Sequence, residues 1–273
     1  MLGMAAQTEI VGQNMSSPFV AFGDDSQYDG ILVFSYVFIP RTRLRRVLRD
    51  IAGIKRKFQF PSGVAIHCRE LFSGQQRAKR GLGHLNQNDV QAVVQHAVTL
   101  INQHDVFLRY AFARTERICG LFSESNTIQL EHTVDGSKHV LPAVFEPKGI
   151  IGLLAQACFA SSPDGSQGPI ASQCEIYAAA DKTKVQFIGN QRQRADSLIT
   201  GFSAIGAQED TIFQIKPTIA SSDFSSIFEL ADIAAYMCSH AIHGSGKQPF
   251  FHDALSRVKY WARSEFLLSP EHV

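Results

Sequence analysis

The sequence lacks several features that would assign it directly to a familiar class of protein. Its five cysteines are scattered and none are spaced Cys-x-x-Cys, which gives no zinc site and suits a reducing cytosol. No apolar run reaches the roughly 18 residues that a membrane-spanning helix needs. The polar first residues do not resemble a secretion signal. We therefore expect a cytoplasmic protein with no membrane partner.

Common catalytic and cofactor motifs are also missing. The chain has no Gly-x-Ser-x-Gly segment, no phosphate-binding Gly-x-x-x-x-Gly-Lys-Ser/Thr loop and no Gly-x-Gly-x-x-Gly fingerprint. Serine-nucleophile chemistry and nucleotide cofactors therefore have no support. The formal net charge is only +1, so any attraction to nucleic acid must come from local clusters of charge rather than from the whole molecule.

The composition is nevertheless that of a folded protein. Of the 273 residues, 45% are hydrophobic and 19% are charged, which is enough apolar material for a core and argues against disorder. Such a length fits one large domain or two small ones. We expect residues 1–17 to be a loose tail and residues 18–273 to form a single domain, without internal repeats.

Hydrophobic periodicity predicts alternating strands and helices after an initial hairpin. Strands are predicted at 18–23, 31–39, 63–67, 106–113, 174–180 and 212–215. Helices are predicted at 41–57, 88–103, 147–160 and 183–199, from Ser226 onward, and at 250–262. The polar segment 115–140 is left open as an inserted loop or hairpin. This order predicts an α/β protein whose mixed sheet has an antiparallel start and is flanked by helices.

Asp232 is the residue that most needs an explanation. It lies in a segment, 228–237, that is apolar almost all round and therefore predicts a buried helix. A charged carboxylate inside a core is costly unless it is paired or holds a metal, so a buried Arg or Lys partner is the structural alternative to a functional role. Nearby, Ser226 and Glu229 have the spacing of a capping box. Trp261 is expected to belong to the core.

Three more acids lie near the ends of predicted strands. They are Asp24 with its neighbour Asp25, Glu70 and Asp181. Ligand sites of open α/β sheets lie at the carboxyl ends of strands, and carboxylates gathered there repel one another unless a cation neutralises them. Oxygen ligands of this kind suit Mg²⁺ or Mn²⁺. Two such ions about 3.5–4 Å apart can activate a water and stabilise a leaving oxygen.

Each of these acids also has a structural alternative. Asp24 and Asp25 fit a hairpin turn, Glu70 fits an ordinary surface position, and Asp181 fits a turn or a helix cap. His67, just before Glu70, is by itself more typical of a structural histidine. The sequence leaves these alternatives open.

Four segments together resemble a known family. They are Asp24-Asp25-Ser26, Ile66-His67-Cys68-Arg69-Glu70-Leu71, Ala179-Ala180-Asp181 and the stretch 225–236. At these residues the chain resembles the family called domain of unknown function 3800, which is grouped with the ribonuclease H-like fold. The matches span residues 18–243 in the expected order. Asp25 stands where the family usually has Glu, and Glu229 stands where many members have Gln.

The resemblance implies a ribonuclease H-like sheet and a metal-dependent nuclease or a related phosphoryl-transfer enzyme. In that scheme Asp24 and Asp181 bind metal from neighbouring strands, and Glu70 and Asp232 complete the two-ion site. His67 orients Glu70 or moves a proton.

Basic segments predict where nucleic acid would bind. Arg77, Lys79 and Arg80 follow Glu70 closely and are predicted to hold a substrate phosphate. The arginine-rich stretch 41–57 is a second basic surface, although a solvated helix face explains it equally. Two alternatives remain: a non-catalytic binding module, in which a residue such as Lys182 replaces the metal, and a hydrolase of nucleotides or other phosphate esters.

Overall fold

The structure is a computed structural model. It describes residues 17–115, 127–134, 137–144, 151, 154–155, 158, 174–179, 218–220, 225–242 and 249–265. Asp181, Lys182, the helix predicted at 183–199 and the strand predicted at 212–215 lie outside the described residues, as do most of the helix predicted at 147–160 and the tail up to residue 16.

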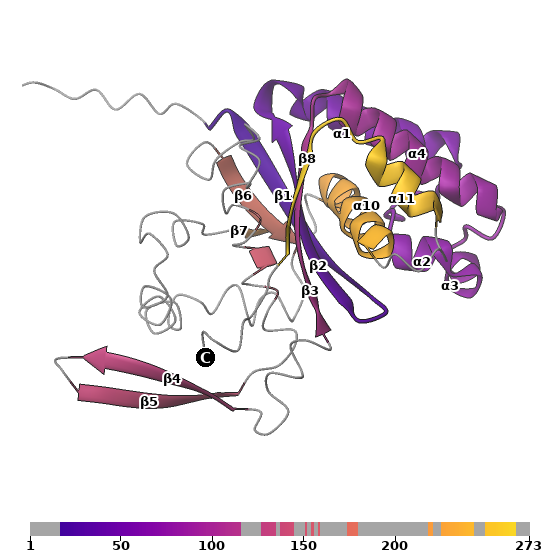
Figure 1. The fold of residues 1–273 in the computed structure, drawn as a ribbon. Helices are drawn as coiled ribbons and strands as arrows, with labels where there is room; N and C mark the ends of the chain where they lie inside the picture. Colours follow the sequence, from indigo (N-terminus) through magenta and orange to yellow (C-terminus); the bar gives the residue numbers. More distant parts are fainter. Residues whose placement is uncertain are drawn as a thin grey trace, which may run out of the picture.

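A six-stranded mixed sheet forms the centre of the molecule, with the order β7-β6-β1-β2-β3-β8 (Figure 1). The strands are β1 (Phe19–Tyr28), β2 (Ile31–Pro40), β3 (Phe107–Arg114), β6 (Cys174–Ala179), β7 (Thr218–Ala220) and β8 (Trp261–Glu265). β2 is antiparallel to both of its neighbours, β1 and β3. β6 and β7 continue in parallel beside β1, and β8 runs parallel to β3. The predicted α/β class, with a mixed sheet that starts antiparallel, is confirmed.

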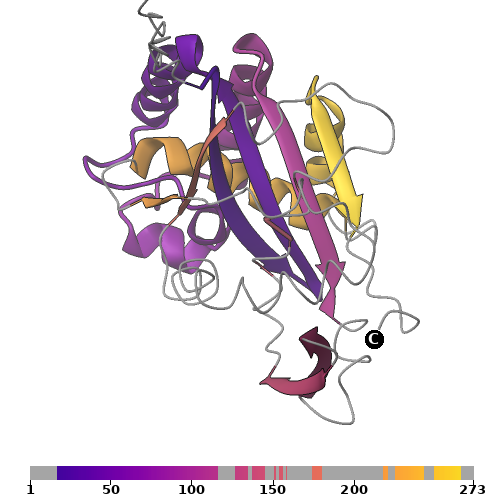
Figure 2. The same ribbon diagram turned by 90° about the vertical axis from the view of Figure 1, so that its left-hand side faces the viewer.

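Helices cover one face of this sheet (Figures 1 and 2). They are the 3₁₀ turn η1 (Arg41–Arg43), α1 (Leu44–Lys57), α2 (Cys68–Phe72), α3 (Gly74–Lys79), α4 (Gln87–Gln103), α10 (Ser225–Ile242) and α11 (Pro249–Ser256). Alternate residues of β2, such as Val33 and Val37, pack into this helical layer. Their neighbours, such as Phe34, form a smaller core on the other face with Ile151 and Leu154, as the period of two along a strand requires.

The first hairpin is longer than the sequence indicates, and this matters for the site. The turn predicted over 24–30 is wrong, because β1 continues to Tyr28 and only Asp29 and Gly30 turn, with φ of 43° and 77°. β2 is buried along nearly its whole length, so its backbone groups need a partner at every position. Asp24 therefore stands inside the sheet, opposite Ser35 of β2.

The segments between α1 and α4 also differ from expectation. No strand forms at 63–67, where the Val64 N–H bonds the Pro61 carbonyl in a turn. Residues Gly74–Lys79, where no helix was predicted, form the short helix α3. α4 begins after Asn86, whose side chain accepts the Asp89 N–H while the Asp89 side chain accepts the Asn86 N–H. Asn88, the predicted cap, lies inside the helix. In the open segment, β4 (Thr127–Val134) and β5 (Ser137–Val144) pair as an antiparallel hairpin.

The predicted C-terminal helix ends early. α11 stops at Ser256, and the side chain of Asn102 binds the departing chain by donating to the Arg257 carbonyl and accepting the Lys259 N–H, both at 2.8 Å. The chain then pairs as β8 with β3 and covers backbone groups that would otherwise be exposed at the sheet edge. Trp261 begins β8 and is 38% exposed, so its predicted core position is wrong.

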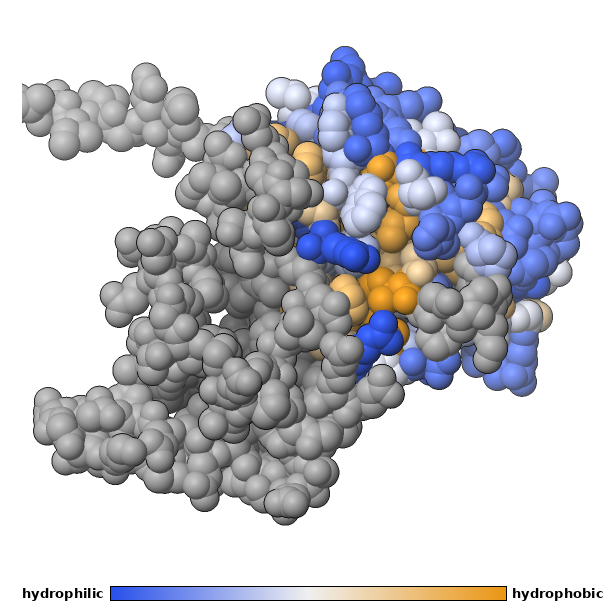
Figure 3. All heavy atoms as spheres, in the orientation of Figure 1, coloured by the Kyte–Doolittle hydropathy of each residue, from blue (hydrophilic) through white to orange (hydrophobic). Residues whose placement is uncertain are grey.

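The outer surface of the helical layer is largely hydrophilic (Figure 3). Arg45, Arg46 and Arg49 of α1 are exposed there, while Val47 and Ile51 of the same helix are buried. This part of the basic stretch is therefore a solvated face of an amphipathic helix in the isolated protein.

Candidate functional site

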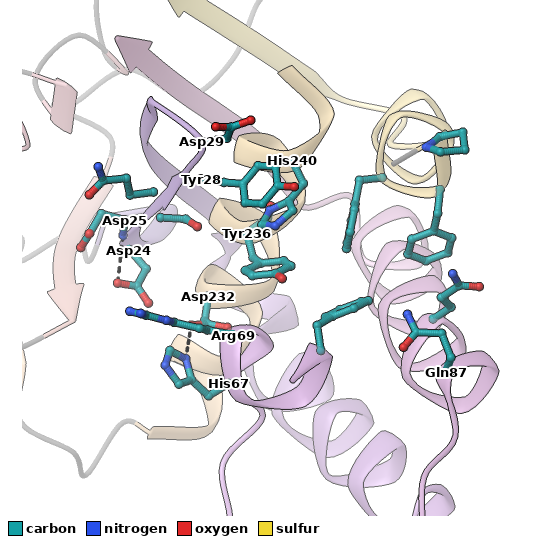
Figure 4. Close-up of a pocket in the computed structure, with 17 residues that line it drawn as sticks. Asp24, Asp25, Tyr28, Asp29, His67, Arg69, Gln87, Asp232, Tyr236 and His240 are labelled. Atoms are coloured by element: carbon teal, nitrogen blue, oxygen red, sulfur yellow. Dashed lines mark hydrogen bonds and ion pairs between the residues drawn. The ribbon is translucent and has the colours of Figure 1, made fainter. Parts of the chain in front are cut away.

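A pocket of 1010 Å³ lies between the hairpin end of β1 and the helices α2, α4, α10 and α11 (Figure 4). Three of the predicted site residues line it, namely Asp24, His67 and Asp232. Asp25 and Arg69 line it as well. Residues far apart in the sequence therefore meet at one cavity, which is the concave arrangement that ligand sites require.

Asp232 is nearly buried, with 14% of its side chain exposed, and both of its oxygens are hydrogen-bonded. Nδ1 of His67 donates to Oδ1 at 2.6 Å, as the dashed line in Figure 4 marks. The backbone N–H of Cys68 donates to Oδ2 at 2.7 Å. The carboxylate is thus held by an imidazole and an amide rather than by a buried Arg or Lys. One hydrogen bond per oxygen leaves further lone pairs for a ligand.

The local fold explains how His67 and Cys68 reach Asp232. His67 has the extended conformation of a residue that precedes a helix, and α2 starts at Cys68. Backbone N–H groups in the first turn of a helix have no partner within the helix, so the Cys68 amide is available to a carboxylate. Cys68 and Leu71 are buried in the helical core and fix α2 in place. The site is therefore built on packed elements rather than on a loop.

The predicted acids that the structure describes all influence the protonation of His67. Its pKa is raised, chiefly by the hydrogen bond to Asp232, and burial opposes this increase. The negative charges of Asp232, Glu70 and Asp24 raise the pKa further. All three of the described predicted carboxylates therefore act on one side chain. The hydrogen-bond partner of His67 is Asp232, whereas the resemblance implied Glu70.

Glu70 does not line the pocket. Its Oε1 accepts a hydrogen bond from Nη2 of Arg80 at 2.6 Å. Arg77 donates from Nη1 to the Leu71 carbonyl at 2.7 Å, and Lys79 is exposed on α3. None of the three predicted phosphate-binding residues lines the pocket; two of them instead join α3 to α2.

Arg69 also lines the pocket and brings a positive charge to it, and no role was predicted for it from the sequence. Its side chain is exposed, and Figure 4 shows it in the part of the pocket that holds Asp24, His67 and Asp232. Burial raises the pKa of Tyr236, and the positive charge of Arg69 opposes this increase. Its position between His67 and Glu70 could have indicated this role from the sequence. An exposed residue in the first turn of a short helix can face the same ligand as its neighbours.

Asp24 projects from the middle of the sheet. It is partly buried, and its Oδ1 accepts the N–H of Asp25 at 2.9 Å. β6 runs parallel to β1 with Ala178 opposite Gly23, and it ends at Ala179. The carboxyl end of a second strand therefore lies next to Asp24.

An aromatic row continues the pocket away from these acids. Neighbouring rings of Tyr28, His240, Tyr236 and Phe72 have centroids 3.8, 3.9 and 5.3 Å apart, with planes inclined by 23°, 26° and 16°. Two of them share one face of α10 with Asp232, at intervals of four residues, which helix geometry places in line. Sequence reasoning missed this row because α10 is apolar on every side, so a single functional stripe has no contrast.

Glu229, one turn before Asp232, is fully enclosed. Lys55 of α1 donates to its Oε1 at 2.8 Å, and only 2% of the Glu229 side chain is exposed. Burial raises the pKa of Glu229, while the hydrogen bond and charge of Lys55 lower it. The carboxylate is thus used to join α10 to α1, which is a different role from the predicted capping box.

The carboxylates present offer oxygen ligands of the kind that Mg²⁺ and Mn²⁺ prefer. Asp24 and Asp232 approach the pocket from the sheet and from α10. Across the described ranges, no group of three His, Cys, Asp or Glu side chains is placed so that it could hold a metal ion. Asp24 and Asp232 thus both line the pocket, but the described residues do not complete a metal site.

Comparison of the chain with family models, with curated proteins and with solved structures finds no match. Among the residues that the structure describes, no helix is both long and apolar enough to cross a bilayer.

Proposed function

We propose that this protein is a metal-dependent nuclease with a ribonuclease H-like sheet. The order of five strands of the main sheet supports the fold, because the antiparallel strands β1, β2 and β3 are followed in the chain by β6 and β7, which continue in parallel beside β1. The resemblance to domain of unknown function 3800 implies a sheet with such a three-stranded antiparallel start. Nucleic acid is the proposed partner.

The observation that carries the proposal is the meeting of Asp24, Asp232, His67 and Arg69 at one pocket. Carboxylates suit a divalent cation, and a guanidinium suits the non-bridging oxygens of a phosphate. A phosphodiester needs both kinds of partner, because its own charge and the charge of the leaving oxygen must be neutralised during hydrolysis.

We assign Asp24 and Asp232 as ligands of Mg²⁺ or Mn²⁺. Asp181 is the proposed third ligand, because it is the second residue after β6, whose end lies beside Asp24. Glu70 is bound by Arg80 and reaches the metal only if that ion pair opens. We therefore expect Glu70 to contribute less than Asp24 or Asp232.

In the proposed reaction a water adds to phosphorus, the bond from phosphorus to the leaving oxygen breaks, and that oxygen takes up a proton. The products are a phosphate monoester and a hydroxyl group. The bound cation supplies water activation and charge neutralisation. Arg69 binds a non-bridging oxygen of the phosphate, and His67 fixes the orientation of Asp232 through its Nδ1–H.

A cleavage assay with matched variants tests this proposal. Labelled DNA and RNA, single-stranded and duplex, are incubated with the wild type in Mg²⁺ or Mn²⁺ and with Asp24→Asn, Asp232→Asn and Asp105→Asn. Asp105 is an exposed acid outside the pocket, so its variant controls for a general loss of charge. We expect the first two variants to lose at least about 100-fold in rate, as for groups that stabilise the transition state, and the control to retain activity. Full activity in Asp232→Asn contradicts the assignment.

The non-catalytic module remains the second candidate because Arg69 is in the same pocket as the two carboxylates. If its guanidinium takes the place of the cation, the wild type will not bind Mn²⁺ and Arg69→Met will. Isothermal titration with MnCl₂ separates the two functions, since a nuclease binds Mn²⁺ with Arg69 present.

A further inference from the structure

The pocket has two chemically different ends. Asp24, Asp232 and Arg69 lie at one end, and the aromatic row described above leads away from them along α10 (Figure 4). Tyr28, Phe72 and Tyr236 are partly exposed, whereas His240 is 5% exposed. Within the row the rings stack on one another, so the row is supported from inside, and its end members, Tyr28 and Phe72, are the rings that can offer a face to a ligand.

Polar groups and another ring complete this second end. Gln87 and Gln91 lie four residues apart on α4 and both line the pocket, as does Phe250 of α11. Phe250 is partly buried and packs edge-on against Phe251, which is 2% exposed. Primary amides can donate and accept hydrogen bonds at once, which is how glutamine contacts the edge of a base.

We propose that the aromatic end binds an unpaired nucleobase, so that the substrate is single-stranded nucleic acid. This inference rests on the proposed nuclease function and specifies its substrate class. Bases of single strands stack on aromatic side chains and offer their pairing edges to the protein. A base inside a duplex has neighbours on both faces and a partner on its edge, so it cannot use this end of the pocket.

Size and charge agree with such a ligand. Sites for small molecules usually enclose about 300–1,000 Å³, and this pocket of 1010 Å³ is at the upper end of that range. Figure 4 shows Arg69 next to Asp232, which is one turn of α10 before Tyr236 of the aromatic row. A nucleotide bound with its base along the row can therefore place a phosphate at the guanidinium.

Fluorescence anisotropy with defined oligonucleotides tests the inference without requiring cleavage. The probes are a labelled single strand, the same sequence as a duplex, and an abasic strand of equal length, each measured in Ca²⁺ and again in EDTA. The variants are Tyr28→Leu and Phe250→Leu. Trp261→Leu is the matched control, because Trp261 is an exposed aromatic residue outside the pocket. Circular dichroism melting establishes that each variant is folded.

We expect the single strand to bind at least about tenfold more tightly than the duplex or the abasic strand, as one stacked base is sufficient to provide. Each pocket variant should bind the single strand about tenfold more weakly than the wild type does and the abasic strand equally well. Trp261→Leu should bind every probe as the wild type does. Equal binding of single strand and abasic strand, or no binding of the single strand in either buffer, overturns the inference. Absence of cleavage with this base preference intact overturns the nuclease proposal alone.

Discussion

Replacing Lys55 by Met should destabilise the protein strongly, because it leaves the enclosed carboxylate of Glu229 without its cation. At an effective dielectric constant of about 20, charges 2.8 Å apart attract by about 6 kcal/mol. Removal of one partner of a buried pair typically costs about 3–5 kcal/mol. Lys55 is 21% exposed, so water can partly replace it, and we expect a loss near the lower limit, about 3 kcal/mol.

The pH dependence of this loss distinguishes an isolated charge from a simple loss of packing. Burial already raises the pKa of Glu229, and removal of Lys55 will raise it further. A group whose pKa is higher in the folded than in the unfolded protein stabilises the fold at pH values below its unfolded-state pKa. That contribution is lost as the pH rises through its folded-state pKa. The deficit of Lys55→Met should therefore be largest at neutral pH and shrink as the pH falls toward the ordinary pKa of glutamate.

Urea unfolding followed by circular dichroism at pH 7 and pH 5 measures both effects. Arg56→Met is the control, because Arg56 is exposed on the same turn of α1, and it should change the free energy of unfolding by less than about 0.5 kcal/mol. The double variant Lys55→Met, Glu229→Leu should recover most of the loss. A single-variant loss below about 1 kcal/mol, or no recovery in the double variant, would refute the reasoning.

Three further predictions concern the fold around the site. Gly23→Ala should cost about 1–3 kcal/mol in thermal unfolding, because a Cβ would lie 2.5 and 2.6 Å from two buried aromatic rings; an unchanged melting temperature contradicts this. Asn86→Ala should cost about 1 kcal/mol and Asn88→Ala nothing, a contrast that reverses if Asn88 is the cap. The stability that wild type gains over His67→Gln in metal-free buffer should be present below about pH 6.5 and disappear as pH rises through the raised pKa; a difference independent of pH contradicts it.

The sequence alone predicted the elements whose signals are local. The apolar stripe over 41–57 predicted the helix that forms η1 and α1, because a period of 3.6 follows from helix geometry. The β-branched and aromatic residues of 31–39 predicted β2. Asp232 was singled out for the same kind of reason, since an acid in an apolar helix violates a rule that acts within a few residues. These predictions needed no knowledge of which segments meet.

Strand limits needed tertiary information. The turn residues around Asp24 and Asp25 favoured a loop, but β2 extends β1 through them because its buried backbone requires a partner. The end of the chain behaves likewise, since the open edge of β3 converts residues after α11 into β8. Pairing energy from distant segments outweighs local propensity in both places.

Which residues make up the site depended on tertiary structure more than the positions of the helices and strands did. Sequence reasoning placed Asp24, His67 and Asp232 in the site, and the structure brings all three to one pocket. Sequence reasoning predicted a phosphate-binding role for Arg80 and none for Arg69, because the ion pair with Glu70 and the direction of each side chain depend on how α2 and α3 pack. The aromatic row likewise arises only when β1, α2 and α10 meet. Local chemistry determined which residues required partners, and three-dimensional packing determined which partners they obtained.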